Sequence, residues 1–424
     1  MKQTVKRTAF GLLLAACVAA AALLFWIEDD VLPPTERPDE EVVETSEEPD
    51  DDTADVATPT PEQPDDEHIL TGWSTYHGDN ALRGVAPWTY PDELAVQWDV
   101  MTGAPVRVSP VADDTALFAV TTRGVAVAAD REGNELWRRE LTIEAPGHDT
   151  PQPIYVDAPI TVVEGRLFIG CDFGNVFALD TATGEELWRT NIGGPVRGAP
   201  NYSADRKRLF VIEQDLGELV CLDMKDGAEL WRSKGVDRSD GSPAVAGEVV
   251  VFGSCASALH VVSEKNGDRL RDIPIANGGG QVAGGVALVD GHAYAGVRDG
   301  RIMRGDVGEG TFTWITQISE DEVFSTPAVY DTQVLATCYD GFIYALDRET
   351  GEIQWQRELA GKPSSPVIVG GKALVAAGGV LYMLQLEEGA VIWELALGDR
   401  ITGPAVLPDM LVVGSEEGVL TALQ

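Results

Sequence analysis

Four residues recur along the chain at fixed spacing: a glycine, an aspartate six residues on, a second glycine ten residues on and a tryptophan fourteen residues on. Copies of this pattern begin at Gly124, Gly174, Gly217, Gly300, Gly341 and Gly379, and a degenerate copy begins at Ser257. The copy from Gly124 has a turn shorter by one residue, and the copy from Gly379 replaces the aspartate with Gln385. The tryptophan positions are 38 to 51 residues apart, and such regularity predicts a row of similar structural units.

Short apolar runs bounded by glycine or aspartate lie between the positions of the pattern. Examples are GRLFIG at 165–170 and VVVFGS at 249–254. Such runs are typical of half-buried strands joined by tight turns. No segment after residue 72 has an apolar period of helical length. Four short strands per unit predict an all-β fold, a β-propeller of four-stranded blades.

The two ends of the propeller region together account for one more blade. Gly418 begins a further copy of the pattern, but the sequence reaches Gln424 where the aspartate would stand. Leu94–Val100 is a tryptophan-bearing strand without a blade of its own. Pairing this strand with the last blade would close the ring and leave no open sheet edge. We therefore predict an eight-bladed propeller over residues 69–424.

Each residue of the pattern has a structural role that we expect it to fill. The aspartate side chain can accept hydrogen bonds from backbone N–H groups two or three residues on, and the glycine after it can adopt positive φ. Tryptophan is expected to pack between neighbouring blades with its indole N–H on a backbone acceptor. These docking residues are Trp98, Trp137, Trp188, Trp231, Trp314, Trp355 and Trp393. Arg271 takes the position in blade 4, where we expect a looser seam or another residue that seals it.

The N-terminus contains a candidate membrane segment. Lys2, Lys6 and Arg7 precede an apolar run of 19 residues at 9–27, which is long enough to span a bilayer as a helix. Within this run, Leu14–Cys17 is similar to the site at which bacterial lipoproteins are cleaved and acylated, in this case at Cys17. Residues 1–27 are therefore either a retained membrane anchor or a lipoprotein signal. Both alternatives place the rest of the chain on the periplasmic side, in the cell envelope.

Most of the negative charge is concentrated just after this segment. Residues 28–67 contain 18 acidic residues, one arginine and seven prolines, and the whole chain has a formal charge of -38. A segment of this composition cannot bury enough apolar surface to fold, so we predict a disordered linker at 28–68. The overall charge argues against nucleic acid as a partner, because phosphates would be repelled.

The repeats GNVFALDTATGEELW and GFIYALDRETGEIQW are similar to the repeat of the pyrroloquinoline-quinone-like β-propellers. The segment WSTYHGDNALRGVAP at 73–87 also resembles the lead-in that precedes the first blade in that family. The resemblance implies a fold that includes quinoprotein alcohol and glucose dehydrogenases. It also includes the lipoprotein propeller of the outer-membrane β-barrel assembly machinery, which binds no quinone.

The features that the resemblance implies for a quinone dehydrogenase are mostly missing. The chain has no adjacent cysteine pair, no CxxCH haem motif and no long insert, and its repeated aspartates are spread around the ring rather than converging on one calcium. We predict no catalytic residue, no metal and no cofactor, with pyrroloquinoline quinone and calcium as the alternative. The cysteines at 171, 221, 255 and 338 are expected to be free thiols.

Two arginines are the candidate binding residues. Arg107 in PVRVSP and Arg197 in PVRGAP stand at the same offset, three residues before the proline that opens an inner strand. They are predicted at one mouth of the central channel, either as solvated rim residues or as a site for an anionic group or a partner carboxylate.

The complete scaffold pattern without a catalytic set predicts a non-enzymatic function. The leading interpretation is a membrane-tethered, monomeric scaffold that binds other envelope proteins, with outer-membrane protein assembly as one such role. The alternative is a quinone-dependent oxidoreductase with an atypical site.

Overall fold

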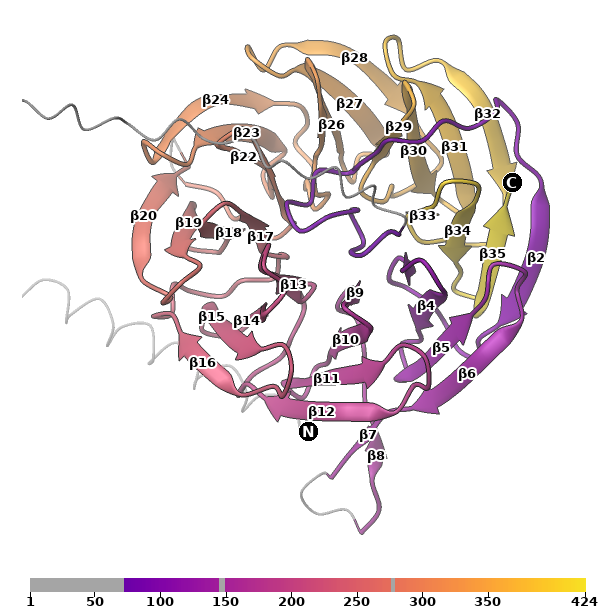
Figure 1. The fold of residues 1–424 in the computed structure, drawn as a ribbon. Coiled ribbons are helices and arrows are strands. Elements are labelled where there is room, and N and C mark those ends of the chain that lie inside the picture. The colour runs from indigo at the N-terminus through magenta and orange to yellow at the C-terminus, as the bar shows by residue number, and fades with distance from the viewer. Residues whose placement is uncertain (1–71, 145–148, 276–278) are drawn as a thin grey trace, which may run out of the picture. The chain divides into compact units, whose positions relative to one another are not determined.

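The computed structural model describes residues 72–144, 149–275 and 279–424. They form an all-β ring of eight sheets, and this confirms the predicted eight-bladed propeller (Figure 1). Among these residues, no helix has the length and apolar character required to cross a membrane. The predicted anchor at 1–27, with Cys17, and the predicted linker at 28–68 lie outside the described residues.

The blades follow one another along the chain, and each runs from an inner strand beside the central channel to an outer strand (Figure 1). Blades 1 to 4 comprise β3 (Val111–Ala112), β4 (Leu117–Val120), β5 (Val125–Ala129) and β6 (Glu135–Glu140); β9 (Thr161–Val163), β10 (Arg166–Gly170), β11 (Asn175–Asp180) and β12 (Glu186–Asn191); β13 (Asn201–Tyr202), β14 (Arg208–Glu213), β15 (Glu218–Asp223) and β16 (Glu229–Arg232); and β17 (Ala244–Ala246), β18 (Val249–Gly253), β19 (Ala258–Ser263) and β20 (Arg269–Pro274). Blades 5 to 7 comprise β21 (Val286–Val289), β22 (His292–Val297), β23 (Arg301–Asp306) and β24 (Thr311–Gln317); β25 (Ala328–Tyr330), β26 (Gln333–Thr337), β27 (Phe342–Asp347) and β28 (Ile353–Glu358); and β29 (Val367–Val369), β30 (Lys372–Ala377), β31 (Val380–Gln385) and β32 (Val391–Ala396).

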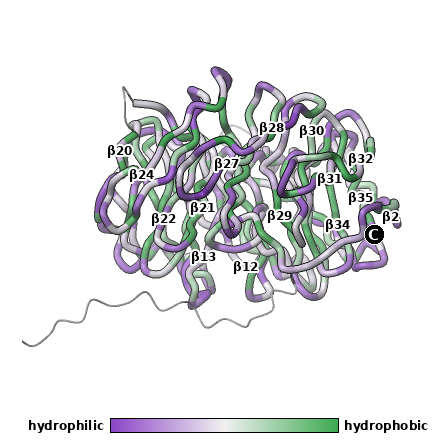
Figure 2. The backbone as a smooth tube through the Cα atoms, turned by 90° about the horizontal axis from the view of Figure 1, so that it is seen from above, coloured by the Kyte–Doolittle hydropathy of each residue, from purple (hydrophilic) through white to green (hydrophobic). Residues whose placement is uncertain are grey.

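Blade 8 is built from both ends of the propeller, as predicted. Its strands are β33 (Ala405–Val406), β34 (Leu411–Gly414), β35 (Val419–Leu423) and the N-terminal β2 (Val96–Met101). β2 pairs antiparallel with β35, and Trp98 lies opposite Ala422. Because these strands are more than 300 residues apart in sequence, their pairing locks the ring. Apolar residues follow the strands, and the hydrophilic turns lie at the two faces of the ring (Figure 2).

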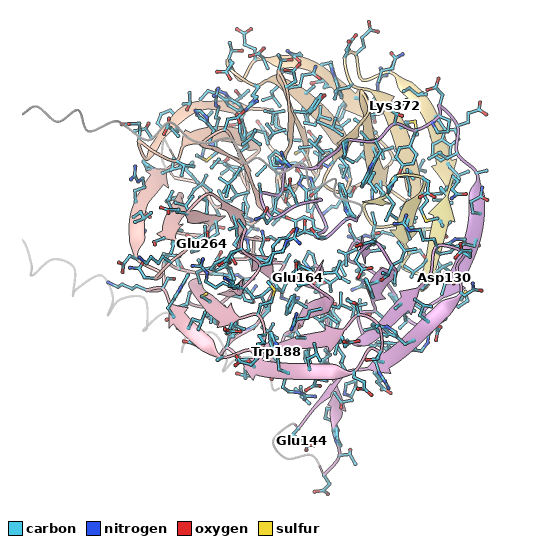
Figure 3. All side chains as sticks on the ribbon, in the orientation of Figure 1. Asp130, Glu144, Glu164, Trp188, Glu264 and Lys372 are labelled. Carbon is cyan, nitrogen blue, oxygen red and sulfur yellow. The ribbon has the colours of Figure 1, made fainter. Side chains whose placement is uncertain are left out.

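The tryptophans lie at the seams between blades. Nε1 of Trp98, Trp137, Trp188, Trp314 and Trp355 donates at 2.8–3.1 Å to carbonyl oxygens in the next blade, those of Arg131, Thr181, Met224, Arg348 and Leu386. Nε1 of Trp231 has no hydrogen-bond partner in the described part of the chain. Trp393 packs with Trp98 against the core of blades 7 and 8. Figure 3 shows one of these side chains, Trp188, beside the outer strands.

The turn between the third and outer strands receives the tryptophan of the preceding blade. In blade 2 this turn is held by Asp180, whose Oδ1 accepts hydrogen bonds from the N–H groups of Ala182 and Thr183. Gly184 follows with φ of 68°, and a Cβ added there would lie 2.6 Å from the ring of Trp137. The glycine of the pattern therefore has a second role that the sequence did not reveal: it lets the neighbouring indole ring approach the backbone.

A comparison of two glycines should separate these roles. Gly247 has φ of 59°, but a Cβ added there would meet no atom within 4 Å. We expect Gly247→Ala to cost about 1–2 kcal/mol of unfolding free energy, the cost of a left-handed residue alone. Gly184→Ala should cost at least about 1 kcal/mol more, because it also displaces Trp137. Urea unfolding of both variants measures the difference, and equal costs would contradict a role for the indole contact.

The seam after blade 4 is sealed without tryptophan. Arg271 is exposed, and a Cβ added to Gly310 of blade 5 would lie 3.2 Å from its Cδ, so its methylene groups lie where an indole ring lies elsewhere. Two residues on, the fully buried Ile273 packs against Gly305, where an added Cβ would lie 2.8 Å from its Cγ2. Ile273 thus supplies apolar contact across this seam. Whether the seam opens more readily than the others stays a prediction, which hydrogen exchange can test.

The lead-in segment runs inside the ring (Figure 1). Together with Tyr90, which follows it, the lead-in hydrogen-bonds to every blade. Trp73 exchanges two backbone hydrogen bonds with Ala112 of blade 1. Carbonyl oxygens of Ser74, Asn80, Ala81, Arg83 and Gly84 accept from the N–H groups of Val162, Val245, Leu288, Val329 and Ile368, in blades 2, 4, 5, 6 and 7. The carbonyl of Asn80 also accepts from the side chain of Asn201 in blade 3, and the hydroxyl of Tyr90 donates to Met410 in blade 8.

Two small elements go beyond the predicted pattern of four strands per blade. Within the lead-in, β1 (Val85–Ala86) pairs parallel with β29 and gives blade 7 a fifth strand. Between blades 1 and 2, β7 (Thr142–Ile143) and β8 (Gln152–Pro153) form a separate two-stranded hairpin. This hairpin projects outward from the ring, with Glu144 next to β7 (Figures 1 and 3).

Candidate functional site

One face of the propeller gathers two kinds of segment from every blade. The central hairpin joins the second and third strands of a blade, and the interblade connection leads from an outer strand to the next inner strand. Because the strands are antiparallel, both segments lie on the same face. In seven blades a central-hairpin N–H donates to an interblade carbonyl: Thr122 to Pro105, Asp172 to Tyr155, Gln214 to Pro195, Cys255 to Arg238, Arg298 to Gln281, Tyr339 to Glu322 and Glu416 to Arg400. We call this face, around the channel, the mouth rim.

The lead-in lies at the other end of the channel. It hydrogen-bonds to Val245 and Val329 on two inner strands, five residues after Asp240 and Phe324 on the interblade connections of the rim. Five extended residues span about 16 Å at ~3.3 Å each. The lead-in therefore lies in the part of the channel away from the mouth rim, and it does not cover the rim.

Arg107 lies on the rim and is paired within the protein. Its Nε lies 2.9 Å and its Nη2 2.5 Å from the two carboxylate oxygens of Glu416, and its Nη1 donates to the hydroxyl of Tyr155 at 3.2 Å. The hydrogen bond with Glu416 raises the pKa of Arg107, and in turn it lowers the pKa of Glu416. This ion pair joins blades 8 and 1 at an exposed position.

Arg197 holds the corresponding position two blades further on. Its Nη1 lies 3.0 Å from a carboxylate oxygen of Asp157, and its Nη2 lies 3.3 Å from Oδ2 of Asp172. Burial raises the pKa of Asp172, and the charge of Asp157 acts in the same direction while Arg197 opposes both. Oδ1 of Asp172 is buried and has no hydrogen-bond partner among the described residues. Titratable groups with such raised pKa values are common in functional sites.

The structure does not bring Arg107 and Arg197 into one ion-pair cluster. Each is part of a rim on which arginines pair with carboxylates, and further pairs are Arg238 with Asp240 and Arg298 with Glu322. Burial opposes ionisation of Asp240, but hydrogen bonds from Arg238 and Gln214 outweigh it and lower the pKa of Asp240.

Sequence reasoning missed a group of apolar residues on this rim. Phe173 and Leu216 stand at the tips of the central hairpins of blades 2 and 3, and they are 52% and 60% exposed. Tyr155, at 37% exposure, lies on the connection between blades 1 and 2. At the corresponding hairpin tip, other blades carry charged residues such as Arg123 and Asp340. Aligning the residue before each hairpin glycine could have revealed Phe173 and Leu216. We define Tyr155, Phe173 and Leu216 as the apolar sector.

Blade 4 contains a buried polar group that begins at its central hairpin. Oγ of Ser254 lies 2.7 Å from Nε2 of His260, and Nδ1 of His260 lies 2.8 Å from Oδ1 of Asp272. This is the order of hydroxyl, imidazole and carboxylate found in serine hydrolases. The side chains of Ser254 and His260 are fully buried, so no substrate can reach the hydroxyl. The group is therefore structural and replaces aromatic residues that fill the same place in other blades, such as Phe177.

His260 should make stability depend on pH. Burial lowers its pKa, although Asp272 opposes this effect, so below about pH 6.5 the unfolded chain binds a proton that the folded chain rejects. Stability should therefore fall as the pH drops, by up to about 1.4 kcal/mol per histidine between pH 7.5 and 5.5. His260→Phe should reduce this loss in urea unfolding. Part of it should remain, because burial also lowers the pKa of His77. An unchanged pH dependence would contradict this role of His260.

The described residues offer no cluster of three or more carboxylate, histidine or cysteine side chains for a calcium ion. Tyr76 and His77 of the lead-in also occupy the channel: the hydroxyl of Tyr76 lies 2.6 Å from Oγ1 of Thr326, and Nε2 of His77 lies 2.9 Å from the carbonyl oxygen of Pro366. The cysteines at 171, 221, 255 and 338 are free, as expected.

The sequence matches the family described as outer membrane protein assembly factor BamB over residues 122–283 and 276–406. The chain belongs to the BamB family. This membership agrees with the resemblance of its repeats to those of the pyrroloquinoline-quinone-like β-propellers. The matched residues cover blades 2 to 7 completely.

Individual BamB proteins are distant relatives of this chain. Outer membrane protein assembly factor BamB of Yersinia pestis is 24% identical over 314 residues, which cover 69% of this chain and 68% of that protein. The crystal structure of BamB from Moraxella catarrhalis superposes with a TM-score of 0.66 at 20% identity, covering 78% of this chain and all of that one. The quinohemoprotein alcohol dehydrogenase from Comamonas testosteroni has a TM-score of 0.67 at 13% identity, covering 84% and 80% of the two chains. At these identities the structural likeness shows the fold alone.

Proposed function

We propose that the protein is a membrane-tethered, non-enzymatic scaffold of the cell envelope that binds other proteins during outer-membrane protein assembly. Membership of the BamB family supports this role, since its relatives are outer membrane protein assembly factors. The observation that carries the proposal is the apolar sector of the mouth rim. Exposed aromatic and aliphatic side chains beside ion pairs are typical of protein interfaces.

The sector and the neighbouring ion pairs provide two features of a docking surface. Phe173 and Leu216 are more than half exposed, so they can bury apolar area against a partner. Arg197 lies beside them and is held in place by Asp157 and Asp172.

Affinity capture from membranes tests the proposal. The full-length protein should recover outer-membrane assembly proteins, and Phe173→Asp combined with Leu216→Asp should recover at most a tenth as much. Leu187→Asp combined with Leu230→Asp is the matched control, because these leucines are 46% and 49% exposed on the outer strands of the same two blades. Failure of the wild type to recover any such protein would refute the assembly role. Equal loss in both double variants would refute the rim as its site.

The proposal includes neither a cofactor nor a catalytic residue. Addition of pyrroloquinoline quinone and Ca²⁺ should give no stoichiometric quinone absorbance, and bound quinone with dye reduction would favour an oxidoreductase instead. The tether is proposed to be the apolar segment 9–27 or a lipid on Cys17. Cys17→Ser should release the protein from membranes only in the second case.

A further inference from the structure

The mouth rim has one sector in which cations lack carboxylate partners. On blades 8, 1, 2, 4 and 5 the rim pairs arginines with carboxylates, but Lys362 and Arg400 form no ion pair with any described residue. Lys362 lies on the connection between blades 6 and 7, and Arg400 lies on the connection between blades 7 and 8. Lys362 and Arg400 are both exposed.

The central hairpin is also shortest at this part of the rim. The central hairpin of blade 7 has only two residues between its strands, Gly378 and Gly379, whereas the other seven blades have three or four. A Cβ added to Gly378 would lie 1.9 Å from the carbonyl oxygen of Ala360, and one added to Gly379 would lie 2.0 Å from that of Gly398. The two connections therefore lie directly against a short hairpin that has no side chains, and they carry Lys362 and Arg400 on either side of it. We call this place, around Gly378 and Gly379, the notch.

Aromatic rings border this notch on the side of blade 6. The rings of Phe324 and Tyr339 lie 4.9 Å apart between centroids, and both residues are only partly buried. Nζ of Lys362 lies 4.1 Å from the centroid of Tyr339, and the guanidinium of Arg298 lies 5.3 Å from that of Phe324. A Cβ added to Gly379 would lie 2.9 Å from the carbonyl carbon of Asp399, the residue before Arg400, so the backbone at Arg400 borders the same hairpin. Burial raises the pKa of Tyr339, and the charge of Arg400 opposes this shift.

The nearby carboxylates are already engaged. Glu322 accepts hydrogen bonds from Arg298, and Glu416 accepts them from Arg107. The charge of Arg400 also lowers the pKa of Glu416, but Arg400 makes no direct ion pair with it. Glu417 accepts from the N–H of Asp399, and Asp340 accepts from the hydroxyl of Tyr344. Two cations and the hydroxyl of Tyr339 thus remain as donors without a protein acceptor among the described residues.

We propose that Lys362, Arg400 and Tyr339 form a binding site for a carboxylate of an extended peptide, and that Phe324 and Tyr339 pack against an aromatic side chain next to that carboxylate. Cation–carboxylate pairing and ring stacking favour the same ligand at adjoining places. The site lies several blades from the apolar sector and would grip a different part of a partner. It deepens the proposed scaffold function and depends on it for the identity of that partner.

Peptide binding to the full-length protein in zwitterionic lipid nanodiscs tests the site. The probe is a fluorescent peptide of alternating Asp and Phe residues, and a second peptide has Asn in place of Asp. Fluorescence anisotropy should show at least tenfold weaker binding for the Asn peptide. Lys362→Glu combined with Arg400→Glu should weaken binding of the Asp peptide to the same extent. Lys225→Glu combined with Lys265→Glu is the matched control, since these exposed lysines lie in turns of the opposite face, and it should bind within twofold of the wild type.

Equal binding of the two peptides, or undiminished binding by the Lys362 and Arg400 variant, would overturn the inference. A thermal melt of each variant excludes loss of folding as the cause. The result is separable from the proposed function, because affinity capture by the wild type tests that function alone. Capture of assembly proteins without selective peptide binding would contradict only the proposed binding site at the notch. Selective peptide binding without capture of assembly proteins would contradict only the assembly role.

Discussion

Trp137→Ala should lower the unfolding free energy by about 3–5 kcal/mol, the range for removal of a buried tryptophan. Trp137 is 9% exposed, and its ring lies against the backbone of Gly184 in blade 2 and at 6.0 Å from the ring of Phe118. Its Nε1 donates to the carbonyl oxygen of Thr181 at 2.8 Å. The substitution would leave a cavity at a seam and an unpaired carbonyl in the next blade. Because a closed ring has no free end, a weakened seam should destabilise all eight blades together.

Two further variants separate the contributions of this side chain. Trp137→Phe keeps an apolar ring but leaves Thr181 without its donor, so it should cost about 1–3 kcal/mol. Leu136→Ala is the control on the same strand, and at 51% exposure Leu136 should contribute no more than about 0.5 kcal/mol. Urea unfolding followed by intrinsic fluorescence and circular dichroism gives all three values. A cost for Trp137→Ala within 1 kcal/mol of that for Leu136→Ala would exclude seam packing as the role of the tryptophan.

The blades could be predicted from sequence because their signals are local. Asp180 and Gly184 define a turn that needs only the three residues between them, and the register of β11 and β12 follows from it. Ring closure by Trp98 could also be predicted, since an unpaired tryptophan strand and an unfinished blade require each other. In both cases a period or a missing partner is visible in the chain itself.

The rim and the lead-in could not be predicted in the same way. Arg107 was found by its repeated position, but its partner Glu416 is 309 residues away and becomes a neighbour only when the ring closes. The notch at Gly378 depends on two interblade connections that lie against one hairpin, and the repeat pattern of the sequence gives no sign of this contact. The lead-in has no period either, because it bonds to a different blade every few residues.

Trp73→Ala should be as damaging as loss of a seam tryptophan, about 3–5 kcal/mol. Trp73 is 2% exposed, packs against Gly78 and shares a core with residues of blades 7 and 8. Its backbone pairs with Ala112 of blade 1. The substitution should therefore loosen the lead-in where the last blades meet the first, and hydrogen exchange should rise in the inner strands of blades 1, 7 and 8 before the outer strands respond.

The phenylalanine variant distinguishes Trp73 from Trp137. Nε1 of Trp73 is buried without a partner among the described residues, whereas Nε1 of Trp137 is bonded. Trp73→Phe removes an unsatisfied donor, and this gain offsets part of the loss in ring volume. We therefore expect Trp73→Phe to cost at least about 1 kcal/mol less than Trp137→Phe, although the two alanine variants cost the same. If the two phenylalanine variants were equally destabilised, the hydrogen bond at the seams would contribute nothing, and the tryptophans would stabilise the ring through packing alone.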